Sequence, residues 1–402
     1  MEHDDPGQRS RFMSNEGFEK LRDFSSANET PFIVIDLEKI SERYDELTNA
    51  LPKAKIYYAV KANPHDEVLA TLHKKGSHFD VASIYEIDKM LGLDVSPDRL
   101  SYGNTIKKEK DIAYAYGKGI RLYTSDSDSD VEKLAKYAPG SRVMFRLLLD
   151  GEGADWPLSR KFGAHPDKVF NLILKARNLG LVPYGISFHV GSQQRDVGQW
   201  DSAIALCRYL FDALKKEGVT LGALNLGGGL PAHYLRPTPE TVEYMASIKR
   251  YLEEDFPREN IDIILEPGRS IAGDAGVIVS EVVLVSKKSD TNDVRWVYLD
   301  VGKFNGMIET LNESIKYPIL VEKERAENTD VSEVILAGPT CDSCDILYEN
   351  FKYKLPDDLK EREKIYVCSA GAYTSSYSSV AFNGFPPIKT YILNGFLKKR
   401  KE

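Results

Sequence analysis

One lysine stands where a lysine is unusual. Lys61 follows residues 56–60, whose β-branched, aromatic and small side chains are typical of a fully buried strand, and it precedes an Asn-Pro pair that ends regular structure. A lysine there either extends its ammonium group into water or has a partner, because lysine is rarely buried alone. In a desolvated pocket the amine loses its charge and becomes a nucleophile or a Schiff-base former. This segment alone leaves both interpretations open.

Further residues that could take part in chemistry stand where other strand-like runs end. They are Asp80, Arg146, His189, the glycine triplet 227–229, Glu266, Gly268 and Arg269. Each alone has a structural explanation, since a single histidine or glycine triplet commonly serves packing or a turn. Glycines after strands let backbone N–H groups approach a phosphate, and an arginine adds a guanidinium for its oxygens. A lysine, a phosphate site and a buried carboxylate together are typical of a pyridoxal phosphate pocket.

The elements that must position these residues alternate between strands and amphipathic helices. The predicted strands are 55–62, 77–82, 99–104, 121–125, 142–149, 182–190, 223–227 and 262–266. The predicted helices between them include 66–75, 166–178, 200–217 and 239–256. Any such alternation also fits an open doubly wound sheet, but eight repeats favour a (β/α)8 TIM barrel. The chemistry of a TIM barrel lies at the C-terminal ends of its strands, which is where the polar residues above fall.

The pattern changes after Arg269. Strand-like runs then follow one another with few helices between them, at 276–286, 294–300, 333–337, 364–369 and 388–393. We therefore expect an α/β fold made of the TIM barrel at 37–275 plus a C-terminal, mostly β domain at 276–402. We expect residues 1–36, whose run 31–36 is strand-like, to join the β domain.

The composition of the chain argues against several kinds of partner and cellular location. A chain of 402 residues is long enough for two or three domains, and a net charge of −8 argues against nucleic acid or an anionic membrane as the main partner. Residues 1–15 lack the apolar core of a signal peptide, and no apolar run is long enough to span a bilayer. The four cysteines, Cys207, Cys341, Cys344 and Cys368, form no disulfide framework and fit a cytoplasmic protein. Cys341 and Cys344 make a CxxC pattern, but no second CxxC or histidine pair accompanies it, so we predict no metal. We expect Cys207 and Cys368 to be buried apolar residues.

Seven runs, in order along nearly the whole chain, resemble one group of enzymes. They are Tyr58-Ala59-Val60-Lys61-Ala62-Asn63, Phe79-Asp80-Val81-Ala82-Ser83, Phe188-His189-Val190-Gly191-Ser192, Gly227-Gly228-Gly229, Glu266-Pro267-Gly268-Arg269, Gly338-Pro339-Thr340-Cys341-Asp342-Ser343 and Gly371-Ala372-Tyr373-Thr374. The chain resembles the alanine-racemase-like pyridoxal phosphate enzymes, and within them the ornithine/diaminopimelate/arginine decarboxylase family. That family has a TIM barrel plus a β domain, in agreement with the pattern of elements.

The resemblance implies a role for each residue of the cofactor site. Lys61 forms the Schiff base with pyridoxal 5'-phosphate, and Asp80 and Glu86 order the pocket near it. His189 stacks on the cofactor ring. Glu266 pairs with the pyridine nitrogen, near Arg146, and an ionised carboxylate there favours protonation of that nitrogen. The residues that hold the phosphate are Ser192, Gly229, Gly268, Arg269 and Tyr373.

The resemblance also implies a homodimer. Cys341 and Asp342 would reach into the barrel of the partner subunit, so that two active sites form at a two-fold interface. Cys341 would donate a proton to Cα after carbon dioxide has left. Phe382 would line the pocket and favour neutral carbon dioxide over the charged carboxylate.

Asp342 is the best guide to the substrate. Aspartate at this place is typical of the ornithine branch, where it meets the distal ammonium, whereas diaminopimelate enzymes usually carry glutamate. A second aspartate that some ornithine enzymes carry is replaced here by Thr310, and Glu309 beside it is a shifted candidate for that charge. We expect ornithine to be converted to putrescine, for polyamine biosynthesis, with lysine to cadaverine as a second reaction, because one methylene changes binding by only about 1–3 kcal/mol. Diaminopimelate and arginine decarboxylase remain alternatives.

Two other interpretations receive less support from the residues. Racemases of the same superfamily typically place an arginine at the pyridine nitrogen, where this chain has Glu266. A non-catalytic regulatory homologue would have lost cofactor residues, which are present here. The segment 150–160, with two glycines and a tryptophan, is predicted either to close over the site as a lid or to be a disordered loop.

Overall fold

The computed structural model describes residues 11–158, 160–257, 260–322 and 330–398. These residues form two compact units. One unit comprises Arg43–Pro231 and Thr238–Ser270, and the other comprises the described residues of Met1–Glu42, Ala232–Pro237 and Ile271–Glu402. Two of the four boundaries between the units fall within helices α3 (Leu37–Ala50) and α11 (Arg269–Ala272), and the other two enclose Ala232–Pro237.

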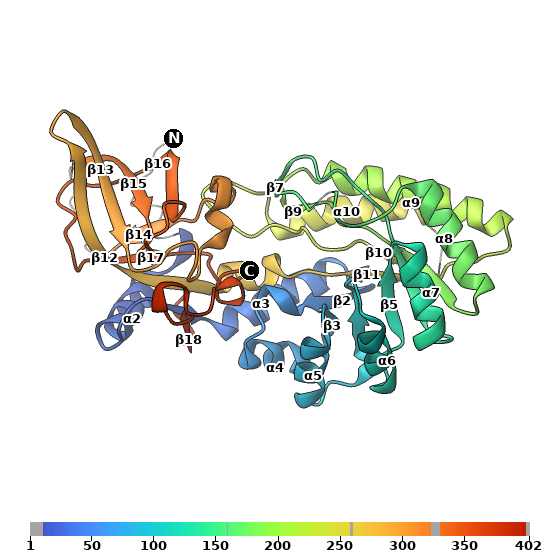
Figure 1. Ribbon diagram of the computed structural model, residues 1–402. Coiled ribbons are helices and arrows are strands. Elements are labelled where there is room, and N and C mark those ends of the chain that lie inside the picture. The colour runs from blue at the N-terminus through green and yellow to red at the C-terminus, as the bar shows by residue number, and fades with distance from the viewer. Residues whose placement is uncertain (1–10, 159, 258–259, 323–329, 399–402) are drawn as a thin grey trace. The chain divides into compact units, whose positions relative to one another are not determined.

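The first unit is built on a closed barrel of eight parallel strands (Figure 1). The strands are β2 (Ala54–Ala59), β3 (His78–Val81), β4 (Leu100–Tyr102), β5 (Leu122–Ser125), β6 (Arg142–Arg146), β8 (Val182–Ser187), β10 (Ala223–Asn225) and β11 (Asp262–Leu265). The barrel closes where β11 pairs with β2, with Leu265 opposite Ile56. All eight predicted barrel strands are confirmed, and the alternative of an open sheet is wrong. Both faces of a barrel strand are covered, and in β2 the consecutive residues Ile56, Tyr57, Tyr58 and Ala59 are accordingly all buried.

Helices α4 to α10 connect the barrel strands. They are α4 (Asp66–Lys74), α5 (Ile84–Gly92), α6 (Glu109–Gly117), α7 (Asp128–Tyr137), α8 (Pro166–Asn178), α9 (Gly198–Lys216) and α10 (Thr241–Asp255). The predicted helices 66–75, 166–178, 200–217 and 239–256 correspond to α4, α8, α9 and α10. The Ser83 side chain caps α5 by accepting from Glu86 N. Helix α9 buries one apolar face at helical spacing, formed by Trp200, Ala203, Ile204, Cys207, Leu210, Phe211 and Leu214.

The second unit contains an eight-stranded sheet. Six strands follow one another in the order β14 (Ile319–Val321), β17 (Lys364–Val367), β12 (Gly276–Ser289), β13 (Asn292–Leu299), β15 (Val331–Ala337) and β16 (Ile346–Pro356). The remaining two are β1 (Phe32–Ile35), which pairs antiparallel with β12, and β18 (Lys389–Ile392), which pairs parallel with β1. The predicted mostly β domain after the barrel is confirmed.

Four strands of the two units were not predicted from the sequence. Strand β16 carries Glu349 and Asn350 in its middle, which breaks the apolar pattern, and β14 has only three residues. The other two are β7 (Ala154–Trp156) and β9 (Ser192–Gln194), which pair in a two-stranded ribbon of the barrel unit. Such short strands are fixed by their pairing rather than by their own composition.

The core of the second unit joins distant parts of its chain. Helix α2 (Asn15–Ser26) packs Phe18 against Tyr366 of β17, with ring centroids 5.1 Å apart. Phe32 and Phe396 belong to the same buried cluster. Of the cysteines, Cys207 and Cys368 are buried, as predicted, and the other two are exposed.

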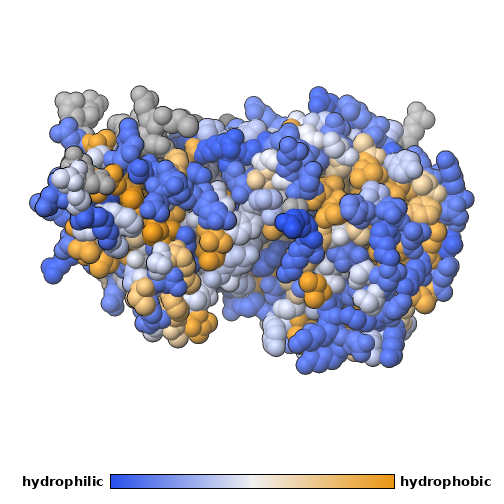
Figure 2. Space-filling model, turned by 45° about the horizontal axis from the view of Figure 1, so that its top comes forward, coloured by the Kyte–Doolittle hydropathy of each residue, from blue (hydrophilic) through white to orange (hydrophobic). Residues whose placement is uncertain are grey.

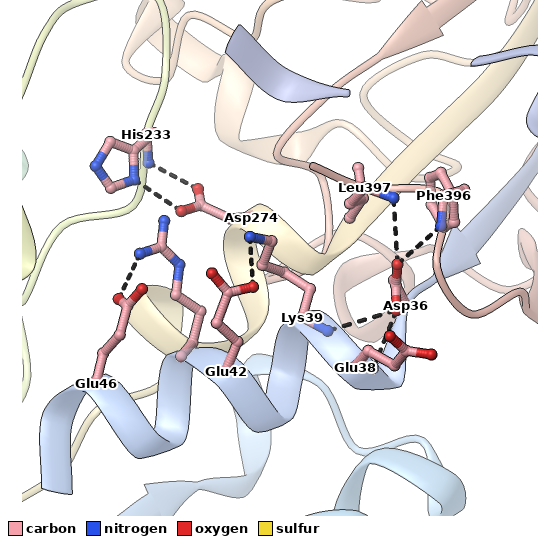
Figure 3. A network of polar contacts seen from close by, with 10 residues as sticks. Asp36, Glu38, Lys39, Glu42, Glu46, His233, Asp274, Phe396 and Leu397 are labelled. Atoms are coloured by element: carbon pink, nitrogen blue, oxygen red, sulfur yellow. Dashed lines mark hydrogen bonds and ion pairs between the residues drawn. The ribbon is translucent and has the colours of Figure 1, made fainter. Parts of the chain in front are cut away.

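Two carboxylates fix loops within the second unit (Figure 3). Asp36, which precedes α3, accepts hydrogen bonds from the backbone N–H groups of Glu38, Phe396 and Leu397 at 3.0, 3.2 and 3.2 Å. Asp274 accepts from His233 twice, from the backbone N at 2.8 Å and from Nδ1 at 2.7 Å. The short segment Ala232–Pro237, inserted in sequence between barrel elements, is thereby held in its unit.

Figure 2 shows hydrophilic side chains over most of the face that it displays, with apolar side chains scattered among them. Among the helices that the structure describes, none is both long enough and apolar enough to cross a membrane.

Candidate active site

Lys61 lies directly beyond a barrel strand, as the sequence predicts. Strand β2 ends at Ala59, and Lys61 is the middle residue of a one-turn 3₁₀ helix, η1 (Val60–Ala62), whose other two residues are buried. The Lys61 side chain is 49% exposed, and its Nζ lies 3.3 Å from Oδ2 of Asp80, which is 5% exposed. The amine is therefore accessible and paired with a buried carboxylate, which combines the two interpretations that its sequence left open.

The acidic groups beside Lys61 lie in a poorly solvated place. Asp80 comes from β3, and its Oδ1 is buried and has no hydrogen-bond partner among the described residues. Glu86, in α5, accepts from Ala82 N at 2.6 Å. Burial raises the pKa of the Glu86 carboxyl, against the lowering effects of the Ala82 N–H and of Lys61. A buried carboxylate oxygen without a partner is costly, and it marks a place where a bound group can supply a donor.

Glu266 follows β11 on the same rim. Burial, together with repulsion from Asp80, raises the pKa of Glu266 to about 7, although Asn225, Lys61 and Arg146 each oppose the rise. Asn225 donates from Nδ2 to Glu266 Oε1 at 2.6 Å. A carboxyl that titrates near neutrality while surrounded by cationic neighbours is poised to accept another positive charge.

Arg146 contributes a cation to this rim, and His189 contributes a neutral ring. Arg146 ends β6, and its guanidinium lies 5.0 Å from the centroid of the Phe162 ring. Desolvation lowers the pKa of Arg146, and Glu266 opposes this effect. His189 follows β8, and burial, then Arg146 and Lys61, lower its pKa well below the ordinary value. Its Nδ1 accepts from Gly191 N at 3.0 Å, which assigns the proton of the neutral ring to Nε2.

The glycine triplet that follows β10 approaches other backbone closely. A Cβ built on Gly229 would lie 2.4 Å from the Gly191 carbonyl oxygen, and φ of Gly229 is +102°. A Cβ on Gly228 would lie 2.7 Å from the Glu266 carbonyl oxygen. Only glycine fits these positions without displacing the neighbouring loops.

Unpaired donors gather next to the triplet. Within the described part of the chain, the backbone N–H groups of Gly228, Gly229 and Gly268 have no hydrogen-bond partner. Arg269 is 3% exposed and donates from Nε to Ser192 Oγ at 3.1 Å. Free amides beside a buried arginine suit the oxygens of a phosphate. The donor set and the close-packed glycines therefore fit the phosphate end of pyridoxal phosphate, and Glu266 fits its ring nitrogen.

The other predicted site residues belong to the second unit. Cys341 and Asp342 are exposed in the loop after β15. Asp342 Oδ1 accepts from Cys344 N at 2.9 Å, and hydrogen bonds from Cys344, its thiol first, lower the pKa of Asp342. Phe382 begins the one-turn helix η6 (Phe382–Gly384), and Tyr373 has a left-handed φ of +56°.

Glu309, the predicted replacement for the second substrate-binding aspartate, is buried in the second unit. Glu309 lies in η4 (Ile308–Glu313) and is 2% exposed, and Thr310 beside it is fully buried. The structure thus brings the predicted residues Lys61 to Arg269 together on one barrel rim. Cys341, Asp342, Tyr373, Phe382 and Glu309 remain predictions for the same site.

Part of the predicted lid segment, 150–160, forms regular secondary structure. Residues 154–156 form β7, and Gln194 of the partner strand donates from Nε2 to the Glu152 carbonyl oxygen at 2.8 Å. The interpretation of 150–160 as a wholly disordered loop is therefore wrong for β7. Residue 159 lies outside the described residues, and closure over the site stays a prediction.

Asn225 is a functional candidate that sequence analysis missed. It is the last residue of β10, is 2% exposed, and its Oδ1 accepts from Gly227 N at 2.9 Å while its Nδ2 binds Glu266. One amide therefore joins the start of the glycine triplet to the carboxylate at the ring nitrogen. The available signal was a polar residue between Leu224 and Leu226 at a barrel strand's C-terminal end.

Comparison with known proteins yields consistent relatives. A protein-family model described as "Pyridoxal-dependent decarboxylase, pyridoxal binding domain" matches residues 37–273. A lysine/ornithine decarboxylase of Selenomonas ruminantium is 32% identical over 357 residues, which are 89% of this chain and 88% of the relative.

Solved structures agree over nearly the whole chain. The lysine/ornithine decarboxylase from Vibrio vulnificus complexed with cadaverine superposes with a TM-score of 0.85 at 28% identity, covering 95% of this chain and 100% of that chain. The arginine decarboxylase of Paramecium bursaria Chlorella virus superposes with a TM-score of 0.86 at 27% identity, covering 94% and 100%.

Proposed function

The chain belongs to the pyridoxal-dependent decarboxylases, and we propose that it removes carbon dioxide from a basic L-amino acid, converting L-ornithine to putrescine and L-lysine to cadaverine. It is an amino-acid decarboxylase that uses pyridoxal 5'-phosphate. The observation that carries the proposal is the rim on which Lys61, Asp80, Glu266 and the unpaired amides of the glycine loops lie together.

We assign the residues that hold the cofactor from the donors and charges at hand. Lys61 would hold it covalently, His189 would lie on its ring, and Glu266 would face its ring nitrogen. The phosphate would be bound by Ser192, Gly229, Gly268 and Arg269, with Tyr373 from the second unit. When bound, pyridoxal phosphate supplies an electron sink for the pair that carbon dioxide leaves on Cα.

The chain's own residues prepare this chemistry electrostatically. Glu266 becomes an anion more readily when a cation faces it, so the pKa that burial raises would fall in the loaded site. Asn225 keeps the carboxylate oriented through a 2.6 Å hydrogen bond. Asp80 holds the Lys61 amine on the rim, and neutral His189 adds no positive charge beside the ring.

Cys341 and Asp342 complete the proposed reaction. Cys341 would donate the proton to Cα, and Asp342, whose pKa is lowered, would be an anion that meets the distal ammonium of the substrate. We propose that both act in the barrel of a partner subunit in a homodimer, which fits their exposure in this chain. Phe382 would add an apolar wall. Glu309, which is 2% exposed, is the proposed second substrate-binding residue.

We propose a division into a cofactor-binding barrel, 37–275, and a β domain formed by 1–36 and 276–402. The pairing of β1 with β12 and β18 supports the assignment of the N-terminal strand to the β domain. We propose a cytoplasmic role in polyamine biosynthesis, which the proposed product and the four free cysteines support.

A comparison of substrates tests the proposal. The purified protein, loaded with pyridoxal phosphate, is given L-ornithine, L-lysine, L-arginine and meso-diaminopimelate in parallel, and carbon dioxide and amine products are measured. We expect kcat/KM to be highest for ornithine and next for lysine. If kcat/KM were highest for arginine, the chain would instead be an arginine decarboxylase, like one of its structural relatives. No carbon dioxide from any of the four would refute the proposal and favour a non-catalytic homologue.

A further inference from the structure

We propose that Asp345 is a positioning residue for the reaction. Its buried carboxylate holds the segment 338–345, which carries Cys341 and Asp342, to the segment 302–305. This inference rests on the proposed function, because it takes Cys341 as the proton donor to Cα and Asp342 as the residue that meets the substrate. The Asp345 carboxylate makes no hydrogen bond to Cys341 or Asp342 and binds Lys303 and Thr340 instead, so it acts through the backbone that carries them.

Both oxygens of the Asp345 carboxylate accept hydrogen bonds, and the residue is 3% exposed. Oδ1 accepts from Lys303 N at 2.7 Å. Oδ2 accepts from Thr340 N at 3.1 Å and from Thr340 Oγ1 at 2.7 Å. The Asp345 backbone adds two bonds within its own segment, accepting from Gly338 N at 2.7 Å and donating to the Asp342 carbonyl oxygen at 3.0 Å. One side chain therefore joins two segments that are distant in sequence.

The space around this carboxylate is closed by two glycines. A Cβ built on Gly302 would lie 2.3 Å from Asp345 Oδ1, and a Cβ on Gly338 would lie 2.4 Å from it. A side chain at either position would displace the carboxylate. The two glycines thus leave room for Asp345 to approach both backbones at hydrogen-bond distance.

The proton donor is held at its backbone as well. Cys341 N donates to Asn383 Oδ1 at 2.9 Å, and Asn383 has a left-handed φ of +51° within η6. Lys303 reaches the same loop from the other side, since its Nζ donates to the Cys344 carbonyl oxygen at 2.9 Å. The Cys341 loop is therefore tied on both flanks.

A third segment joins the same network. The Phe304 carbonyl oxygen accepts from both N and Oγ of Ser379 at 2.7 Å, and the rings of Phe304 and Phe382 lie with centroids 4.6 Å apart. Three segments thus meet around Asp345, and each leads to a predicted site residue, namely Glu309, Cys341 or Phe382. A carboxylate that binds donors from two of these segments fixes where the thiol stands relative to the rest of this unit.

Four variants separate positioning from general stability. Asp345→Asn keeps the shape but turns one acceptor into a donor that faces another donor. Thr340→Val removes a single hydroxyl bond and leaves the carboxylate intact, and Thr340→Ser restores the hydroxyl. Asp290→Asn, at the exposed turn between β12 and β13, is the matched control.

Two quantities are measured for each variant. The dimer content of each variant is determined separately by sedimentation. The first is backbone amide exchange at 302–309 and 338–346 in the protein without substrate. The second is the ratio of aldehyde to diamine product per carbon dioxide released. If Cys341 is misplaced, the proton would be added to the cofactor instead of to Cα. Hydrolysis by water would then release an aldehyde product and convert the cofactor to its amine form.

We expect Asp345→Asn to lower kcat about tenfold or more and to raise the aldehyde fraction several-fold, with faster exchange in both segments. Thr340→Val should change both readouts in the same direction by less, and Thr340→Ser and Asp290→Asn should match the wild type. Wild-type exchange and product ratio in both Asp345→Asn and Thr340→Val would overturn the inference, as would activity lost only in step with dimer content. If the wild type releases no carbon dioxide, the proposed function fails, and amide exchange alone then decides whether Asp345 holds the two segments.

Discussion

The side-chain amide of Asn225 donates to Glu266 Oε1 at 2.6 Å while its oxygen accepts from Gly227 N at 2.9 Å. The end of β10 thereby controls the carboxylate that follows β11. Glu266 would otherwise be harder still to ionise, because this hydrogen bond opposes the rise of its pKa caused by burial and by Asp80. Asn225 therefore favours the anion that a pyridinium nitrogen needs.

The first prediction concerns pH dependence in Asn225→Ala. Loss of the hydrogen bond raises the pKa of Glu266 further, so the acidic limb of the kcat/KM profile should move to higher pH by about 0.5–1 unit, equivalent to about 1 kcal/mol. Asn178→Ala, at the exposed end of α8, is the control. An unmoved limb, or one moved to lower pH, would show that Asn225 does not act through Glu266.

The second prediction concerns stability in Glu266→Gln without cofactor. The folded-state pKa of Glu266 lies near 7, above its unfolded value, so the folded protein binds the extra proton and wild-type stability from this group is lost as pH rises through about 7. Glutamine avoids that loss. The free energy of unfolding of the variant relative to wild type should therefore grow by roughly 2–3 kcal/mol between pH 5 and pH 8. Denaturant titrations at the two pH values measure it, and a constant difference would contradict the buried-carboxylate assignment.

The third prediction concerns the glycine loop. Gly229→Ala forces a Cβ to within 2.4 Å of the Gly191 carbonyl oxygen, so we expect cofactor affinity to fall about tenfold or more as the unpaired amides move. Gly76→Ala is a stringent control, because Gly76 has a similar φ of +88° but open space around its Cβ position. Equal affinity for pyridoxal phosphate in the two variants, measured by fluorescence titration, would mean that backbone strain rather than the cradle is responsible.

The fourth prediction concerns substrate recognition by Asp342. Asp342→Asn removes the charge that would meet the distal ammonium, so KM for ornithine and lysine should rise about tenfold or more while pyridoxal phosphate binding stays unchanged. Ser343→Ala, the next exposed residue, serves as the control. Should KM remain at the wild-type value, the substrate ammonium must be bound elsewhere, with Glu309 as the first residue to test.

Much of the fold could be predicted from the sequence, because helices and strands each have a characteristic spacing of apolar residues along the chain. The apolar runs that became β2 and β11 are continuous, and α8 matches its predicted bounds of 166–178, since its apolar spacing and Pro166 define it locally. Strand β16 could not be predicted, because Glu349 and Asn350 interrupt its pattern and its pairing with β15 is long-range.

Some residues of the candidate site could likewise be predicted from the sequence, and others could not. Lys61, Glu266 and Arg269 were predicted because each ends a barrel strand or follows one within a few residues, where a barrel gathers its chemistry. Asn225 and Asp345 were not, because their significance lies in hydrogen bonds to residues that are remote in the chain. In the sequence Asp345 is a charged residue between two predicted strands, and its 3% exposure is evident only from the structure.

We propose that the rim around Lys61 holds pyridoxal phosphate through that lysine. Borohydride reduction of the purified, cofactor-loaded protein, followed by peptide mass spectrometry, tests it most directly, with Lys55→Ala and Lys61→Ala in parallel. Lys55 lies on strand β2, which precedes Lys61, and its Nζ pairs with Asp262 Oδ2 at 2.7 Å. We predict a reduced pyridoxyl phosphate adduct on Lys61 in the wild type and in Lys55→Ala, and none in Lys61→Ala. An adduct on another lysine, or an unmodified Lys61 in a protein that decarboxylates ornithine, would contradict the account.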